Sequence, residues 1–422
     1  MVGMAVIEAA PVVVPVAAEP IQDGAVLVDG DRIAAVGERR ELCAAHPGVV
    51  VRKWRGVLTP GLVNAHTHLQ YTDFAGLASL RTSFYRWLAQ VGERRTGFTD
   101  PMWIASAQRG IEALLRSGTT AAADIVTEPV VLEPTARSGL AGISYLEVVV
   151  ADDERWARTK RDQLLRGLDS VPEGRAVGVS PHTLYTVGTE VFRALAKLSR
   201  ARGLRMHPHL AESADEVRYV RDGAGPLADI ARTSGCSFEL SGVGTQRTPT
   251  AQMAFLEALG ADTHVAHGVH CDAADRALLR EYGASVALCA RSNATLGVGD
   301  PPVAAYLAEG SPIAIGTDSL ASSPSLDLLE EARALRDLAR RQGYVGSDLD
   351  RRIIDAATRG GAVAMGANDF GVLTPGSRAD LAVFDVPVDS DPHRALIDHG
   401  AGRCTATILA GHLVHHATAS PR

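Results

Sequence analysis

The sequence predicts an α/β fold: a (β/α)8, TIM-like barrel with a small composite β-sandwich domain built from both ends of the chain. Three features carry this prediction. The middle alternates short apolar runs with longer amphipathic stretches, both ends have the character of short strands, and 422 residues exceed the usual size of one hydrophobic core. We place the small domain at residues 1–57 and 367–422, and the barrel at residues 58–366.

The two ends of the chain are rich in strand-forming residues. Residues 24–37, GAVLVDGDRIAAVG, alternate apolar and polar side chains around Asp29-Gly30, which is typical of a β-hairpin. The segments at 371–385 and 405–416 have the same character.

The middle of the chain contains eight short apolar runs, at 62–66, 119–126, 142–150, 176–180, 205–210, 263–269, 285–290 and 312–317. Amphipathic stretches at 103–117, 188–202, 272–282 and 325–341 predict helices between them. Eight strands that alternate with helices favour a closed barrel over an open sheet. Residues 213–262 are longer than a crossover needs, so we expect a substrate-covering loop there.

Composition excludes several classes of partner. The net charge is −7 with both signs interspersed, so no basic patch predicts binding to nucleic acid or to a membrane surface. The five cysteines form no CxxC pair, which favours a reducing compartment. The apolar N-terminal segment has no Lys or Arg before Arg32 and is broken by prolines, which argues against a signal peptide or a membrane span. We expect a cytoplasmic protein.

Metal-binding residue types end four of the apolar runs. In a (β/α)8 barrel, chemistry sits at the carboxyl ends of the strands. The residues found there are His66 and His68 after the first run, His207, His209 and Glu212 after the fifth, His264, His267 and His270 after the sixth, and Asp318 after the eighth. Three neutral imidazoles and one carboxylate suit a Zn²⁺-like ion with a position left for water. Such an ion lowers the pKa of its water from 15.7 toward roughly 7, giving a hydroxide nucleophile.

Several longer motifs carry a resemblance to a known family. They are LTPGLVNAHTHL, SPHTLY (180–185), HLAES, AHGVH and GTDSLASSPSLDLLEE (316–331). In combination they resemble the amidohydrolase superfamily, in particular its branch of aromatic-base deaminases and chlorohydrolases. The tail GVLTPGSRADLAVFD resembles the strand that returns to the composite β-domain of that family.

The resemblance implies a role for each matching residue. His66, His68, His209 and Asp318 match the metal ligands, with Zn²⁺ expected and Fe²⁺ as the alternative. Glu212 matches the residue that moves a proton to a substrate ring nitrogen, His267 the residue that orients the hydroxide, and Asp318 also the acceptor of the water's proton. His182 matches a histidine that contacts the substrate. We interpret His264 and His270 as structural.

The scarcity of lysine favours one metal ion. Binuclear members of the superfamily use a carboxylated lysine after the fourth strand, but RAVGVSPHTLY (175–185) contains none. The chain's lysines are Lys53, Lys160 and Lys197, and the last two fall in flanking helical stretches.

Two segments bear on the substrate. SVALCARSNATLG (285–297), which offers Arg291 and Asn293, and EVRYVRDGAGPLADI (216–230) resemble a bacterial subgroup that deaminates 6-amino-6-deoxyfutalosine on the futalosine route to menaquinone. That nucleoside carries a benzoate, which arginine can hold bidentately. The candidate arginines are Arg81, Arg86, Arg247 and Arg291. Related adenosine-type deaminases often hold ribose hydroxyls with a glutamate after the first strand, where this chain has Gln70.

Other functions share the same residues. A deaminase of 5′-methylthioadenosine, adenosine, S-adenosylhomocysteine or guanine would use this ligand set, and so would a chlorohydrolase-like triazine hydrolase. A third class is an inert barrel that serves as a scaffold. In the favoured interpretation the partner is a small-molecule nucleoside, and a homodimer is compatible with the resemblance because members of the family often form dimers.

Overall fold

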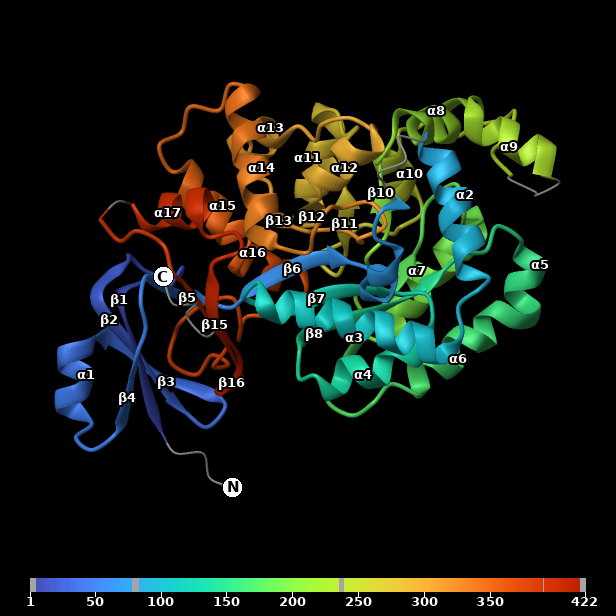
Figure 1. Ribbon diagram of the computed structural model, residues 1–422. Helices are drawn as coiled ribbons and strands as arrows, with labels where there is room; N and C mark the ends of the chain where they lie inside the picture. The colour runs from blue at the N-terminus through green and yellow to red at the C-terminus, as the bar shows by residue number, and fades with distance from the viewer. Residues whose placement is uncertain (1–4, 78–82, 235–238, 390, 418–422) are drawn as a thin grey trace.

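Eight parallel strands in two four-stranded sheets form the centre of the molecule (Figure 1). The computed structural model describes residues 5–77, 83–234, 239–389 and 391–417. The strands, one in each predicted apolar run, are β6 (Leu62–Thr67), β7 (Thr119–Val126), β8 (Ala141–Val148), β9 (Ala176–Pro181), β10 (His209–Leu210), β11 (His264–His267), β12 (Ser285–Leu288) and β13 (Ile313–Ile315).

The two parallel sheets meet at both edges. On one side, single bridges pair Val179 with Met206 and Met206 with Thr263. On the other side, the backbone N–H of Asp318 donates to the carbonyl of His66 at 2.9 Å. The eight strands therefore follow one another in chain order, and their carboxyl ends lie on the same side.

Helices cover the outside of these strands (Figure 1). The four predicted amphipathic stretches form α3 (Asp100–Arg116), α7 (Thr189–Ala201), α11 (Ala273–Glu281) and α14 (Leu328–Arg341). The carboxylates of Asp272 and Asp327 accept backbone hydrogen bonds at the starts of α11 and α14, which explains where these two helices begin. The remaining helices here are η1 (Leu69–Phe74), α2 (Phe84–Arg95), η3 (Pro129–Val131), α4 (Leu132–Arg137), α5 (Asp153–Arg155), the π-helical turn η4 (Trp156–Lys160), α6 (Arg161–Asp169), α12 (Ala290–Leu296), α13 (Val303–Ala308), α15 (Leu349–Ala356), α16 (Arg359–Ala364) and α17 (Pro392–His399).

Residues 213–262 contain three short helices rather than one long loop. They contain α8 (Ala214–Asp222), α9 (Pro226–Ser234) and α10 (Pro249–Phe255). The Ser213 hydroxyl and the Thr248 hydroxyl accept hydrogen bonds from the backbone at the starts of α8 and α10. These caps turn a segment rich in Gly and Pro into short helices.

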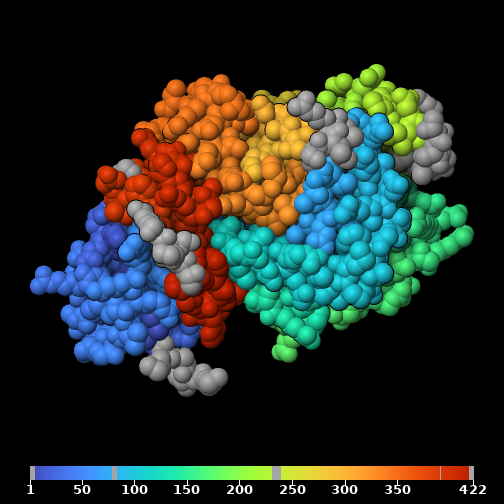
Figure 2. Space-filling view, in the orientation of Figure 1, coloured from blue at the N-terminus to red at the C-terminus, as the bar shows by residue number. Residues whose placement is uncertain are grey.

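The smaller domain is one mixed sheet that uses strands from both ends of the chain. Its strands are β1 (Val6–Val13), β2 (Ile21–Asp29), β3 (Arg32–Glu38), β4 (Val50–Lys53), β5 (Val57–Pro60), β14 (Leu381–Phe384), β15 (Cys404–Leu409) and β16 (His412–His416). The order is β16-β15-β14-β5-β1-β2-β3, with β4 also beside β1, and α1 (Arg39–Ala45) packs next to β2 and β3. Figure 2 shows the blue and red segments side by side on the surface.

This sheet differs in one way from the predicted sandwich. The hairpin at Asp29-Gly30 is confirmed, because β2 and β3 pair up to Asp29 and Arg32. However, β1 pairs with β4 over Val6–Ala9 and with β5 over Val12–Val13, so the strands join one continuous sheet instead of two. β5 also belongs to this sheet, which therefore continues to residue 60.

Among the described residues, none of the helices combines the length and the apolar character that crossing a bilayer requires.

Candidate metal and active site

Three histidines and one aspartate converge at the carboxyl ends of the strands. His66 and His68 come from the end of β6, His209 from β10, and Asp318 follows β13. The Nε2 atoms of His66 and His68 lie 3.7 and 3.5 Å from Asp318 Oδ1, and His209 Nε2 lies 3.4 Å from His68 Nε2. A tetrahedral ion with ligands at about 2.0–2.2 Å separates its ligand atoms by about 3.3–3.6 Å, and these three separations are close to that range. His66, His68 and Asp318 form one group that could hold a divalent metal such as zinc, and His209 lies beside it.

A chain of hydrogen bonds decides which nitrogen of His66 is free. His207 Nδ1 lies 2.9 Å from the carbonyl oxygen of His264, so His207 donates there. Burial lowers the pKa of His207 to about 3, and the neutral ring must therefore accept at Nε2. His66 Nδ1, 2.9 Å away, donates to it. The Nε2 of His66, which is buried and has no other hydrogen-bond partner among the described residues, is left as a bare lone pair that faces the cluster.

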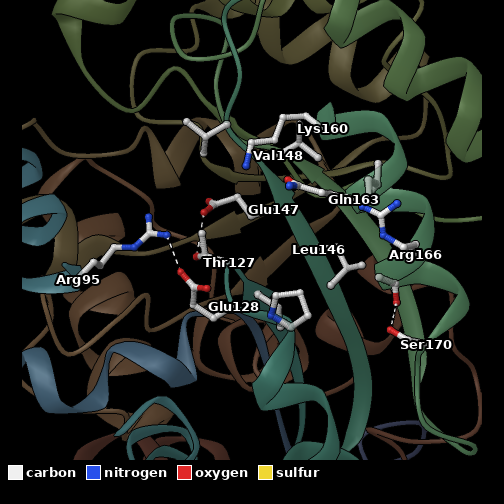
Figure 3. Close-up of a pocket in the computed structure, with 15 residues that line it drawn as sticks. Arg95, Thr127, Glu128, Leu146, Glu147, Val148, Lys160, Gln163, Arg166 and Ser170 are labelled. Atoms are coloured by element: carbon white, nitrogen blue, oxygen red, sulfur yellow. Dashed lines mark hydrogen bonds and ion pairs between the residues drawn. The ribbon is translucent and has the colours of Figure 1, made fainter. Parts of the chain in front are cut away.

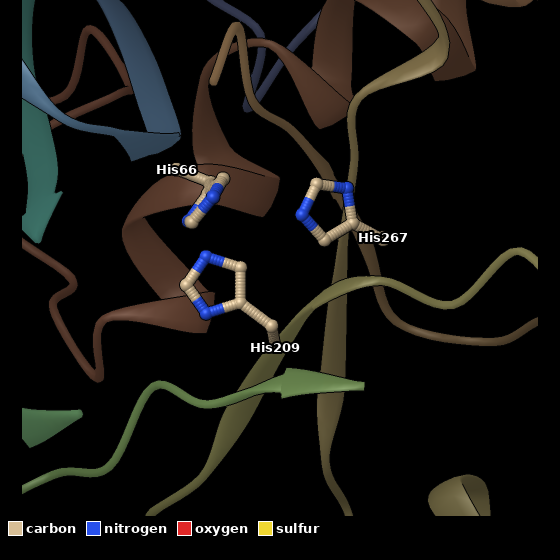
Figure 4. Close-up of side chains that lie close together, drawn as sticks. All are labelled: His66, His209 and His267. Atoms are coloured by element: carbon tan, nitrogen blue, oxygen red, sulfur yellow. The ribbon is translucent and has the colours of Figure 1, made fainter. Parts of the chain in front are cut away.

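The same reasoning assigns the protons of the other two rings in Figure 4. His209 Nδ1 donates to the carbonyl oxygen of His182 at 3.2 Å, which leaves Nε2 free to bind a metal. His267 Nδ1 instead accepts from the side-chain amide of Asn293 at 3.1 Å. His267 Nε2 therefore carries a proton, and it lies 3.7 Å from Glu212 Oε1. This histidine is a donor into the site.

Asp318 is buried and held as an anion. Its Oδ2 accepts from the hydroxyls of Ser292 and Ser322 at 2.6 and 2.7 Å. Burial alone would raise its pKa, but His68 and His267, together with these two hydroxyls, lower it below its usual value. Asp318 also has a φ of 58°, in the left-handed region that non-glycine residues rarely adopt. Strain of this kind is commonly stored at functional sites.

Glu212 is a buried carboxyl of the site, and its surroundings favour the neutral form. Burial raises its pKa well above the usual value, and the charges of Asp318 and Glu216 raise it further. The turn that carries it is fixed by Glu216, whose two carboxylate oxygens accept from the backbone N–H groups of Ala211 and Glu212, each at 2.9 Å. A neutral carboxyl beside a metal cluster suits a general acid.

These side chains open into a cavity of about 260 Å³. Helix α2 covers it, and the Trp87 indole N–H donates to the carbonyl of Ala321 at 2.8 Å to anchor that helix. The described residues of 213–262 do not line the cavity. The lining residues are His68, Tyr71, Phe84, Trp87, Leu88, Val91, Gly92, Arg95, Glu147, Val149, His182, Tyr185, Thr186, His209, Glu212, His267, Asp318, Ser319 and Ala321.

Of the predicted substrate-binding residues that the structure describes, only His182 lines the catalytic cavity. His182 lines the cavity, and Asn293 reaches it only through His267. Arg291 lies 2.6 Å from Glu330 Oε2, Arg247 stacks over Phe255 at 4.0 Å, and Arg86 is exposed on α2. The structure brings none of these three arginines into the cavity lining. Arg81 lies outside the described residues.

Two lining residues, Arg95 and Glu147, were not singled out from the sequence. Glu147 is the next-to-last residue of β8, but the predicted apolar run at 142–150 continued past it and concealed a strand-end carboxylate. Arg95 ends α2 and lies 2.9 Å from Glu128, a pairing that no local sequence signal indicates.

A second, larger cavity adjoins the first (Figure 3). It has a volume of about 650 Å³ and shares Arg95, Glu147 and Val149 with the catalytic cavity. Lys160 and Arg166, from η4 and α6, line the opposite wall. π-helical turns are rare and are frequent at functional sites, and here the turn ends at Lys160.

Comparison with known proteins defines the family. Residues 57–414 match the amidohydrolase family, and residues 24–48 match the bacterial imidazolonepropionase-like composite domain. The chain therefore belongs to the amidohydrolase family, as the sequence motifs predicted.

Three relatives illustrate the similarity. A 5-methylthioadenosine/S-adenosylhomocysteine deaminase of Haloarcula marismortui is 33% identical over 353 residues, which covers 82% of this chain and 76% of the relative. An aminodeoxyfutalosine deaminase of Deinococcus radiodurans is 32% identical over 363 residues, 81% of either chain. The crystal structure of an adenosine deaminase from Xanthomonas campestris with bound zinc matches with a TM-score of 0.80 and 25% identity, covering 97% of this chain and 93% of that one.

Family and site together define a metal-dependent hydrolase that acts on C–N bonds. The side chains that could hold a divalent ion are present and face one another. This intact set argues against the inert scaffold.

Purified protein is expected to carry roughly one divalent ion per chain, because the groups that share His66 lie together at one place and no lysine among the described residues lines the catalytic cavity. Asp318→Ala should lower the metal content and remove most activity, whereas Asp300→Ala, at an exposed position, should retain both. Elemental analysis by mass spectrometry measures the ratio. A second tightly bound ion would contradict the mononuclear site.

Proposed function

We propose that this chain is a (β/α)8-barrel aminohydrolase that removes the 6-amino group of an adenosine-like nucleoside, with release of ammonia. The observation that carries the proposal is the joint placement of free imidazole nitrogens, the buried carboxylate of Asp318 and the buried carboxyl of Glu212 at one cavity. Relatives named as deaminases of adenosine-like nucleosides support it.

In this proposal His66, His68, His209 and Asp318 hold one divalent cation, Zn²⁺ or Fe²⁺. When bound, the cation supplies the Lewis acidity that makes water a nucleophile near neutral pH. Asp318, the anionic carboxylate, takes a proton from the attacking water. Glu212, held neutral by burial, donates a proton to a ring nitrogen, which makes the neighbouring carbon more electrophilic. His267 donates from Nε2 to the attacking oxygen as charge develops on it.

The second cavity favours a nucleoside with a large 5′ substituent. It shares Arg95, Glu147 and Val149 with the catalytic cavity, so the two cavities adjoin. Its volume of about 650 Å³ adds room for a substituent that the catalytic cavity of about 260 Å³ does not provide. Its lining carries three cationic side chains, Arg95, Lys160 and Arg166, against two carboxylates, Glu128 and Glu147. Arg95 is paired with Glu128, so Lys160 and Arg166 supply the positive charge of the far wall. A carboxylate at the far end of the substrate would be attracted there. We therefore place 6-amino-6-deoxyfutalosine first among the substrates, with 5′-methylthioadenosine and S-adenosylhomocysteine second because a relative carries those names.

A panel of substrates tests the function directly. We expect release of ammonia from 6-amino-6-deoxyfutalosine at a higher kcat/KM than from 5′-methylthioadenosine, S-adenosylhomocysteine or adenosine, and none from guanine or a chlorotriazine. The change in ultraviolet absorbance on loss of the purine amine follows the reaction. Halide release from the triazine, with no deamination of any nucleoside, would contradict the proposal.

Glu212→Gln should lower kcat by about 10²- to 10⁴-fold, the usual contribution of a positioned general acid–base. The substitution is nearly isosteric and Glu212 is not among the proposed ligands, so metal content and the melting temperature should stay close to those of the wild type. Kinetics and elemental analysis of the same preparation separate the two effects. Wild-type turnover by this variant would rule out the role.

Arg95→Met should lower kcat/KM for 6-amino-6-deoxyfutalosine more than for 5′-methylthioadenosine. A charge-assisted hydrogen bond contributes about 1.5–3 kcal/mol, or about one to two decades in kcat/KM. The matched control is Arg94→Met, because Arg94 donates to the carbonyl of Asp73 and lines neither cavity. Equal losses of Arg95→Met on both substrates would show that Arg95 supports the fold through Glu128 instead.

A further inference from the structure

The proposed reaction leaves one carboxylate of the catalytic cavity unused. The side chain of Glu147 is only 5% exposed, and its Oε1 has no hydrogen-bond partner among the described residues. Its Oε2 is held by the Thr127 hydroxyl, which donates at 3.1 Å. Thr127 is held in turn by Gln70 and by Tyr71. One oxygen of Glu147 is thus fixed, and the other is left as a buried acceptor without a donor.

The position of Glu147 indicates what could supply that donor. The residue lines both cavities, and in Figure 3 its carboxylate extends toward Thr127 from β8. An oxygen of Glu147 lies 3.9 Å from His182 Nε2, and it lies within 4.8 Å of the nearest ring nitrogen of the proposed ligand His209. Buried polar atoms in proteins are normally paired, so an unpaired acceptor at the wall of a cavity points to a ligand that donates.

We infer that Glu147 accepts a hydrogen bond from a hydroxyl of the substrate's ribose and selects ribonucleosides over deoxynucleosides. The inference rests on the proposed function. With the amine of the purine at the metal cluster, the sugar leaves the opposite edge of the base, toward the passage between the two cavities where Glu147 stands. The 5′ substituent then continues into the larger cavity.

Gln70 does not compete for this role. It is fully buried, its side-chain oxygen accepts from the backbone N–H of Glu128 at 3.1 Å, and its amide is committed to Thr127. It is absent from the lining of the catalytic cavity. The acceptor for the sugar is therefore Glu147 of β8, and Gln70, which follows β6, supports it through Thr127.

A graded pair of variants tests the inference. Glu147→Gln keeps an acceptor without its charge, and Glu147→Leu removes the acceptor at similar size. The kcat/KM of each is measured on adenosine, 2′-deoxyadenosine and 3′-deoxyadenosine. Wild type should prefer adenosine over at least one deoxynucleoside by about ten-fold or more, as expected for a hydrogen bond to a charged group. The ratio of kcat/KM for adenosine to kcat/KM for the deoxynucleoside should be smaller in Glu147→Gln and close to one in Glu147→Leu. The change should lie mainly in KM. Calorimetric binding of inosine and 2′- and 3′-deoxyinosine, which have no amine to lose, should follow the same order.

The matched control is Glu128→Gln, which changes a neighbouring carboxylate that is paired with Arg95 and does not line the catalytic cavity. It should keep the preference for ribose. If Glu147→Leu instead lowers turnover of all three nucleosides equally, or shifts only the pH profile through His182, Glu147 is not a sugar acceptor. Equal use of ribose and deoxyribose by the wild type would overturn this inference and leave the deaminase proposal standing. Absence of turnover on every adenine nucleoside would overturn both.

Discussion

The site depends on one requirement: each histidine that binds a metal must present a nitrogen without a proton. Backbone carbonyls meet this requirement for two of the three ligands. The carbonyl of His264 acts on His66 through the intervening ring of His207, and the carbonyl of His182 acts directly on His209. The link to His66 depends on the His207 side chain, whereas the link to His209 needs only a backbone carbonyl. Burial completes the arrangement, since it lowers the pKa of His66 well below its usual value and keeps the ring neutral.

Contacts between the strand ends fix the positions of these side chains relative to one another. Asn64 donates to the Thr317 hydroxyl at 2.7 Å, and its oxygen accepts from the backbone N–H groups of His66 and Thr317. This one buried amide joins β6 to the segment after β13 and so holds His66 near Asp318. His267, with a φ of 74°, shares the left-handed conformation of Asp318. Two strained residues, one at the end of β11 and one after β13, are consistent with a backbone shaped by the site rather than by local preference.

Much of this arrangement could be predicted, and the exceptions have physical reasons. Polar residues that end apolar runs identified the cluster, because strand alternation and the common direction of parallel strands bring such residues together. Glu147 obeys the same rule, but three valines follow it, so the apolar run continues past the end of the strand and hides the carboxylate. The contact of Trp87 with Ala321 joins residues 234 positions apart, and the position of α2 over the cavity follows from it. Long-range contacts of this kind leave no trace in local periodicity. The sequence therefore indicates a covering loop at 213–262 and gives no sign that α2 covers the cavity.

The composite sheet has a consequence for how the chain is made. β5 has β14 as one of its two neighbours in the sheet, and Thr59 meets Ala382 there across 323 residues of sequence. At a synthesis rate of about 5–20 residues per second, the first strands leave the ribosome tens of seconds before their partners exist. During that interval the edge of β5 is open to pairing with other chains, and a chaperone that shields the nascent N-terminal strands would raise the yield of native protein.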